Sequence, residues 1–243
     1  MDWQDLRRRA LDETKKALSE SVGDDQLITQ GVSAIEDTDK AANLLASRLR
    51  EWYEWYFPEL SRKVSDNKAF ARLVAEKSRQ ELMGEIGVAK TMGAGLEGED
   101  VADMAGLAGS IGALFQERDR LESSLERVMR RHCPSVLDLA GPTIGGRLLR
   151  EAGSLRRLAT IQAGTIQVYG AEKALFRHLR SGSKPPKHGY IIHHPLLTQA
   201  PQKEKGRVAR SLADKLSIAA RVDYFKGAPI GEKLRKDLEE RFS

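Results

Sequence analysis

The sequence has one cysteine, few aromatic residues and no long apolar run, and each shortage narrows the class of protein. Because Cys133 is the only cysteine among 243 residues, no internal disulfide can form, which fits a reducing compartment. No run of 18 apolar residues occurs, so a membrane span is not expected. The opening MDWQDLRRR also lacks the apolar core of a signal peptide. We expect a cytoplasmic protein with no membrane partner.

Patterns typical of a catalytic or cofactor-binding site are missing as well. GAGLEG (93–98) matches the GxGxxG fingerprint, but it follows a helical segment and is flanked by acids that repel phosphate, so we interpret it as a turn. The histidines between 188 and 194 lack nearby cysteines or paired carboxylates to complete a metal site, which favours surface or RNA-contacting histidines. His132 and Cys133 diverge on a helix and form no dyad. We expect no catalytic residue, no metal and no bound cofactor.

Helical periodicity dominates what is present, and sustained strand-like alternation is absent, so we expect an all-α protein. Helices are predicted over 3–22 and 66–90. A 3-4 spaced seam between them predicts a long helix that Pro58 stops or kinks. The seam consists of Ile35, Thr38, Ala42, Leu45, Leu49, Trp52 and Tyr56.

A return helix is predicted after the glycine turn at 93–98. Its seam consists of Leu107, Ile111, Leu114, Arg118, Leu121, Leu125 and Val128. Two seams on either side of a glycine turn predict an antiparallel coiled-coil hairpin, and we expect the projecting 66–131 hairpin to pair with a second copy of the chain.

Pro134 and Gly141–Pro142 mark the start of a second region, with helices predicted over 142–158, 164–181 and 203–225. A polar helix over about 229–242 is expected to fray. The predicted organisation is a short N-terminal segment (1–31), a helical coiled-coil region (32–134), a small helical domain (135–226) and a C-terminal polar helix (227–243).

Positive charge gathers in the second region. Residues 141–210 hold 13 Lys and Arg against three acids, a net charge of +10, whereas the whole chain carries +5. Charge of one sign in one segment exceeds what solubility needs and is typical of a surface that binds phosphate. Lys173, Arg177 and Arg180 are spaced to share one helical face, and the loop Lys184-Pro-Pro-Lys187 follows directly.

We predict an RNA-binding and protein-binding face here, because small residues at the start of the helix allow a second backbone to approach. Its residues are Gln167, Gly170, Ala171, Lys173, Ala174, Arg177, Arg180, Lys184, Lys187 and His188.

Five aromatic residues crowd into REWYEWYFPEL (50–60), namely Trp52, Tyr53, Trp55, Tyr56 and Phe57. On a helix they would cover more than half the circumference, so one buried face cannot absorb them all. Two interpretations stay open: a local core, or a docking surface for another protein, since Trp and Tyr dominate interface hot spots.

The aromatic stretch, TMGAGLEGEDV (91–101), AGSL (152–155), TIQ (165–167), GAEKALFR (170–177) and GRVARSLADKLSIAARVD (206–223) occur in the order found in the Nop family. Between about 32 and 226 the sequence closely resembles the Nop-domain scaffold of box C/D ribonucleoproteins, and the lack of a Lys/Glu-rich tail favours an archaeal type. The resemblance implies self-association through the coiled coil. It also implies a Nop domain that binds kink-turn RNA together with a ribosomal-type protein.

The resemblance further implies docking of fibrillarin, the methyltransferase that holds S-adenosylmethionine and performs guided 2′-O-methylation. We assign that docking to the five aromatic residues, although family members usually carry a larger N-terminal domain for it. An alternative is the splicing-related Nop protein, which has no methyltransferase partner. An RNA-modifying enzyme is disfavoured, because no acid–base pair, metal cluster or cofactor loop is present.

Overall fold

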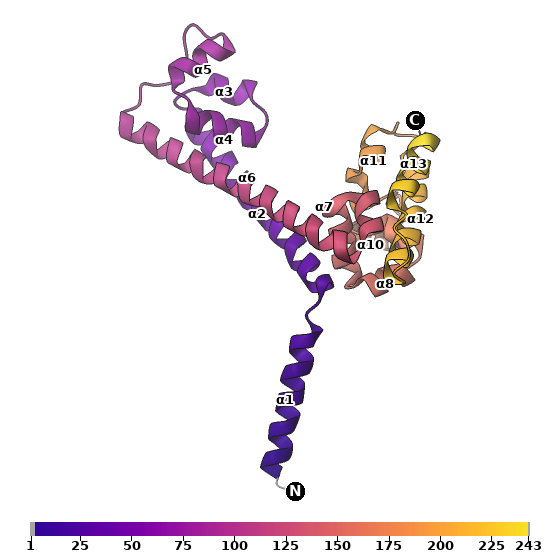
Figure 1. The fold of residues 1–243 in the computed structure, drawn as a ribbon. Helices are drawn as coiled ribbons and strands as arrows, with labels where there is room; N and C mark the ends of the chain where they lie inside the picture. Colours follow the sequence, from indigo (N-terminus) through magenta and orange to yellow (C-terminus); the bar gives the residue numbers. More distant parts are fainter. Residues whose placement is uncertain (1–2, 243) are drawn as a thin grey trace. The chain divides into compact units, whose positions relative to one another are not determined.

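The computed structural model describes residues 3–242, and these residues form helices and loops with no β-strand (Figure 1). The all-α prediction is therefore confirmed. No helix in this part of the chain is long and apolar enough to cross a bilayer. The α-helices are α1 (Trp3–Ser21), α2 (Asp24–Tyr53), α3 (Pro58–Lys63), α4 (Asn67–Glu76), α5 (Arg79–Ile86), α6 (Gly98–His132), α7 (Pro134–Ala152), α8 (Leu155–Thr160), α9 (Ala163–Val168), α10 (Glu172–Ser181), α11 (Pro195–Gln199), α12 (Lys205–Tyr224) and α13 (Gly231–Phe242), with a 3-10 turn, η1 (Tyr190–His193).

The chain divides into two compact units: residues 33–121 form one, and the flanking stretches that precede and follow them form the other. In the 33–121 unit, α2 and α6 share a core with the three short helices between them. Arg118 of α6 lies 3.4 Å from Asp39 of α2, so the two long helices are neighbours in this unit. The core includes Ala42, Leu49, Phe57, Phe70, Met104 and Ile111.

The continuous helix predicted over 66–90 is wrong. α4 ends at Glu76, and a new helix, α5, starts after Ser78. The Ser78 side chain accepts from the Glu81 amide, and the Glu81 carboxylate accepts from the Ser78 amide at 2.8 Å, which forms a capping box. Such a box satisfies the first amides of a new helix and therefore separates two helices where the apolar spacing alone suggested one.

The seam predicted for the return helix is also shifted. Ile111 and Leu125 are buried as expected, but Leu107 and Leu114 are only half-buried. Met104, Ala108 and Phe115 occupy the buried positions of α6 in their place. Burial follows the fit of the helix against its neighbours, so a small Ala108 can lie deeper than a larger Leu107 on the adjoining row.

In the second unit, α12 is the central helix and packs against α7, α8 and α9. Its buried residues include Val208, Leu212 and Leu216. At its C-terminal end the carboxylate of Asp223 accepts hydrogen bonds from the backbone N–H groups of Ser135 and Val136, at 3.0 and 2.9 Å. These N–H groups start α7 and have no partner within that helix, so a side chain from α12 caps α7.

Helices in this unit end next to glycines, and the apolar spacing of the sequence did not predict these ends. α7 is kinked at Gly141, where the backbone is not helical and φ is 71°, so its second half starts close to the predicted position 142. It ends earlier than predicted, before Gly153, which has a φ of 85°. The helix predicted over 164–181 is two helices, α9 and α10, separated at Gly170, with a φ of 86°. This left-handed conformation suits glycine and terminates a helix. The prediction for 203–225 agrees with α12, and α13 is anchored on α7 by buried Leu234 and Leu238, contrary to the expected fraying.

Candidate nucleic-acid interface

The segments that follow α9 and precede η1 pack tightly against each other, next to the predicted basic residues of α10 and its following loop. A Cβ built at Gly189 would lie 1.7 Å from the carbonyl oxygen of Tyr169, and one at Gly170 would lie 2.8 Å from the ring of Tyr190. Tyr190 is held further by its hydroxyl, which donates to Glu151 of α7 at 3.0 Å. Both glycines are required by this close approach. Gly170 is therefore small because an internal aromatic ring covers it.

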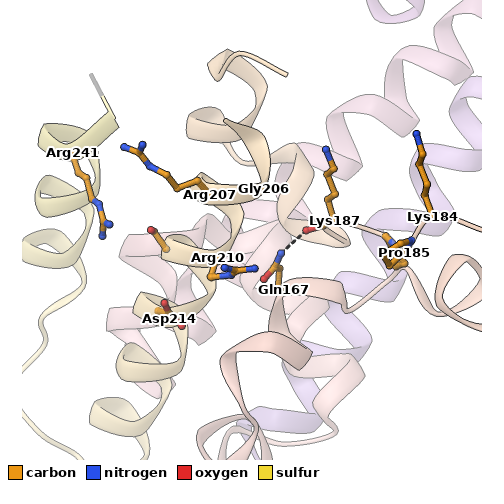
Figure 2. Close-up of a pocket in the computed structure, with 11 residues that line it drawn as sticks. Gln167, Lys184, Pro185, Lys187, Gly206, Arg207, Arg210, Asp214 and Arg241 are labelled. Carbon is orange, nitrogen blue, oxygen red and sulfur yellow. Dashed lines mark hydrogen bonds between the residues drawn. The ribbon is translucent and has the colours of Figure 1, made fainter. Parts of the chain in front are cut away.

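The loop between α10 and η1 carries two of the predicted lysines. Lys184 and Lys187 are exposed, and Pro185 and Pro186 between them restrict the backbone. The side-chain amide of Gln167 donates to the carbonyl oxygen of Lys187 at 2.6 Å. Figure 2 shows this bond as a dashed line, with the Lys187 side chain extending away from Gln167. The amide thus holds the backbone of the loop while the ammonium group stays accessible.

The loop faces α12 and α13 across a groove of about 760 Å³ (Figure 2). Arg207 and Arg210 of α12 and Arg241 of α13 line it together with the two lysines, and Asp214 is the one acid in the lining. The five cations have no salt-bridge partner among residues 3–242. Sequence reasoning missed all three arginines as site residues. The first two lie in the basic segment, three positions apart, but Arg241 is distant in sequence and reaches the groove only through the tertiary fold.

α10 presents two adjacent strips to solvent. Lys173, Arg177 and Arg180 form the basic strip that the spacing predicted, and none of the three has an acidic partner in the described part of the chain. Beside it lie Phe176 and Leu179, whose exposed fractions are 59% and 70%. The basic strip and Phe176 together line a shallow depression of about 410 Å³. The sequence prediction did not include the apolar strip, although two large apolar residues three apart on a basic helix are a recognisable signal.

The remaining predicted residues lie at the edges of this surface. Ala171 precedes α10, and Ala174 is half-buried within it. His188 is half-buried beside the lysines, and burial, followed by Lys205 and Lys187, lowers its pKa below the usual value. A neutral His188 can accept or donate a hydrogen bond without adding charge to the groove.

The aromatic stretch of the other unit does not lie on one helix, which corrects the geometric premise of the prediction. α2 ends at Tyr53, and the following turn buries Phe57, while Trp55 is 69% exposed. Trp52 and Tyr56 are half-buried. The turn forms because Gly93 packs against it: a Cβ there would lie 1.9 Å from the carbonyl oxygen of Tyr56. Tyr53 and Phe57 therefore belong to the core, whereas docking of another protein at the exposed Trp55 stays a prediction.

Two residues that were considered as candidates for catalysis or metal binding, Cys133 and His194, lie in the interior of the fold. Cys133 is buried, and burial raises the pKa of its thiol far above the ordinary value, so it carries no thiolate at neutral pH. His194 is buried and bonds to the carbonyl oxygen of Leu139 at 2.9 Å through Nε2. Within residues 3–242 no group of three or more potential ligands is arranged around a common metal position.

This all-helical unit gathers accessible cations on a helix, a loop and a groove, an arrangement that is typical of modules that bind polyanions. The comparisons with known proteins then give its family. A family model described as Nop, snoRNA binding domain, fibrillarin, matches residues 34–243. An uncharacterized NOP5 family protein of Methanocaldococcus jannaschii is 42% identical over 93% of this chain and 60% of its own length. Nucleolar protein 56 of Mus musculus is 36% identical over 90% of this chain and 42% of its own length.

A solved structure shows the same relationship. A chain from the crystal structure of a fibrillarin/Nop5p complex matches with a TM-score of 0.55 and 26% identity, covering 99% of this chain and 77% of that one. The chain therefore belongs to the Nop family, which confirms the resemblance found in the sequence. It spans 60% and 42% of the lengths of the two curated relatives.

Proposed function

We propose that this chain is a non-catalytic scaffold of a box C/D guide ribonucleoprotein. In this role its Nop domain binds a kink-turn RNA together with the ribosomal-type protein that holds it. The scaffold places fibrillarin for guided 2′-O-methylation of rRNA or tRNA, and S-adenosylmethionine belongs to that methyltransferase. Membership of the Nop family supports the proposal, as does the similarity to a chain from a fibrillarin complex.

The observation that carries the proposal is the pair of strips on α10. Lys173, Arg177 and Arg180 offer three positive charges to phosphate, whereas Phe176 and Leu179 offer apolar area that RNA phosphate cannot use. A single helix with both strips suits a composite partner, in which RNA covers the basic strip and a protein covers the apolar one. The groove beside Arg207 and Arg210 extends the phosphate-binding surface.

Fibrillarin docking and self-association are assigned to the other unit. Of the five aromatic residues, Trp55 is the exposed anchor and Trp52 and Tyr56 are half-exposed, so we assign the contact with the methyltransferase to these three. Tyr53 and Phe57 support the contact from within the core. We assign self-association to the α2–α6 pair, because long paired helices with exposed apolar residues such as Leu44 commonly take a further helix.

RNA binding is tested by replacing Lys173 and Arg177 together with alanine. Each cation that neutralises a phosphate contributes roughly 0.7–0.9 to the slope of log K against log salt. We expect the double variant to flatten that slope by about one to two units. The matched control removes Lys63 and Lys90, two exposed cations of the 33–121 unit, and should leave the slope unchanged. Equal slopes for both variants contradict an RNA-binding role of the basic strip on α10.

The composite site is tested by measuring affinity for kink-turn RNA with and without its protein. The wild-type chain should bind the RNA–protein complex more tightly than the RNA alone. Replacing Phe176 and Leu179 by serine should remove this gain and leave binding to bare RNA unchanged. An affinity that does not respond to the added protein overturns the composite site.

Fibrillarin docking is scored separately by co-purification with wild-type chain and with Trp55→Ala. Loss of about 2 kcal/mol of binding free energy is expected if Trp55 is a hot spot. RNA–protein binding without any fibrillarin capture favours the splicing-related alternative.

A further inference from the structure

We propose that Gln167 is a positioning residue for Lys187. Its side-chain amide holds the loop so that the Lys187 ammonium group reaches phosphate, and it acts through the loop instead of contacting RNA. This inference rests on the proposed RNA binding and deepens it, because it makes an uncharged residue a determinant of how many phosphates the surface neutralises.

Gln167 holds the loop at two points. Its side-chain Nε2 donates to the carbonyl oxygen of Lys187 at 2.6 Å, and its own carbonyl oxygen accepts from the Gly189 amide at 2.8 Å. The backbone bond fixes the end of the loop next to the tight junction at Tyr169 and Tyr190. The side-chain bond reaches two residues further, to the part of the loop that carries the lysines.

Few other contacts hold that part of the loop. Pro185 and Pro186 have no backbone N–H to donate. Among the described residues, the Gln167 bond is the only hydrogen bond that reaches residues 184–187 from another element. At the other end, the loop is held by His178 of α10, which bonds to the carbonyl oxygen of Ser183. Within residues 3–242 the Gln167 side chain therefore supplies the one direct hydrogen bond to the backbone of Lys187.

Repulsion between the positive charges around the groove makes a hydrogen bond that holds the loop necessary. Lys184, Lys187, Arg207, Arg210 and Arg241 surround one groove that contains a single acid, so before phosphate binds they repel one another. A carboxylate anchor would hold the loop but would cancel part of the charge. An amide bonded to a backbone carbonyl oxygen resists the repulsion and leaves every positive charge available.

The test is a double-mutant cycle of Gln167→Met and Lys187→Met, measured as binding to the kink-turn RNA–protein complex over a range of salt concentrations. Methionine keeps the length of either stem and removes the polar group. Lys187→Met should lower the salt slope by roughly 0.7–0.9. Gln167→Met should lower the slope in the same direction although it removes no charge, and it should add nothing further when Lys187 is already replaced. Gln80→Met, at an exposed glutamine of the other unit, is the matched control.

A second measurement needs no RNA. The Gly189 amide donates to the carbonyl oxygen of Gln167, and its hydrogen exchange in the free chain should be faster in Gln167→Met than in the wild type or in Gln80→Met. Unchanged exchange overturns the positioning role. An affinity loss in Gln167→Met with an unchanged slope that adds to the Lys187→Met effect also overturns it, because Gln167 then contacts RNA directly. A wild-type chain that shows this loop exchange pattern but binds no RNA overturns the proposed function instead.

Discussion

α12 and α10 both carry cations in the same unit, but the fold holds them in opposite ways. α12 buries residues along its whole length and packs against α7, α8, α9, α11 and α13, whereas no residue of α10 is buried. The sequence of α12 is constrained on its inner face, which leaves Arg207 and Arg210 on a rigid support. No residue of α10 is needed for a buried core, so its exposed side chains can be used for contacts with a partner. α12 therefore holds its cations on a helix that is packed into the core, whereas α10 carries its cations on a helix with no buried residue.

The largest expected effect comes from a substitution that disrupts the packing of α12. Leu212→Ala removes a fully buried side chain from the middle of α12 and leaves a cavity, so it should cost about 2–5 kcal/mol of unfolding free energy. Chemical denaturation with circular dichroism measures this loss. A cost below about 1 kcal/mol, which is typical of exposed sites, contradicts the central role of α12.

The next effect breaks the link from α12 to α7. Asp223→Ala leaves the buried N–H groups of Ser135 and Val136 without their acceptor, which should cost about 1–3 kcal/mol. Asp214→Ala on the exposed side of the same helix is the matched control and should change the unfolding free energy by less than about 0.5 kcal/mol. Equal costs for the two variants rule out a capping role for Asp223.

A pH-dependent effect sharpens the comparison within the same unit. Burial lowers the pKa of His194 below its ordinary 6.5, and its Nδ1 accepts from the Leu196 amide, which a protonated ring cannot do. Since the unfolded chain binds the proton more readily, the stability from neutral His194 is fully present above pH 6.5. It is lost as pH falls from 6.5 towards the folded pKa, with a slope no steeper than about 1.4 kcal/mol per pH unit. His194→Gln should flatten this dependence in denaturation curves, and His193→Gln, at an exposed neighbour, should not.

The smallest effect on stability belongs to α10. Leu179→Ala should change the unfolding free energy by less than about 0.5 kcal/mol, because the side chain is 70% exposed. The contrast with Leu212→Ala is the same chemical change on two helices of one unit. Thermal denaturation of both variants checks it, and a large loss for Leu179→Ala would show that α10 supports the fold as well as the partner.

The same difference explains what the sequence could predict. α12 follows a regular apolar spacing, so its extent was predicted to within about two residues at each end. The basic strip of α10 was also predicted, because i, i+4 and i+7 positions share a face wherever the helix begins. The break at Gly170 was missed, because it depends on the ring of Tyr190, twenty positions later.

Contacts between distant segments account for the other misses. Arg241 reaches the groove through the packing of α13, and the turn at Trp55–Phe57 forms because Gly93 approaches it. Neither contact leaves a periodic trace in the sequence. The predicted helix over 66–90 failed for a local reason instead: Ser78 and Glu81 form a capping box that starts a new helix, and the prediction rested on the apolar spacing alone.

The capping of α7 by Asp223 has a consequence for the order in which the chain matures during synthesis. The first turn of α7 leaves the ribosome 88 positions before the carboxylate that completes it. Until α12 has been made and docked, the amides of Ser135 and Val136 depend on water, so α7 cannot bury its N-terminal end early. The unit therefore closes late and as a whole. A nascent chain stalled before residue 223 should remain sensitive to protease at the α6–α7 junction, long after the 33–121 unit is complete.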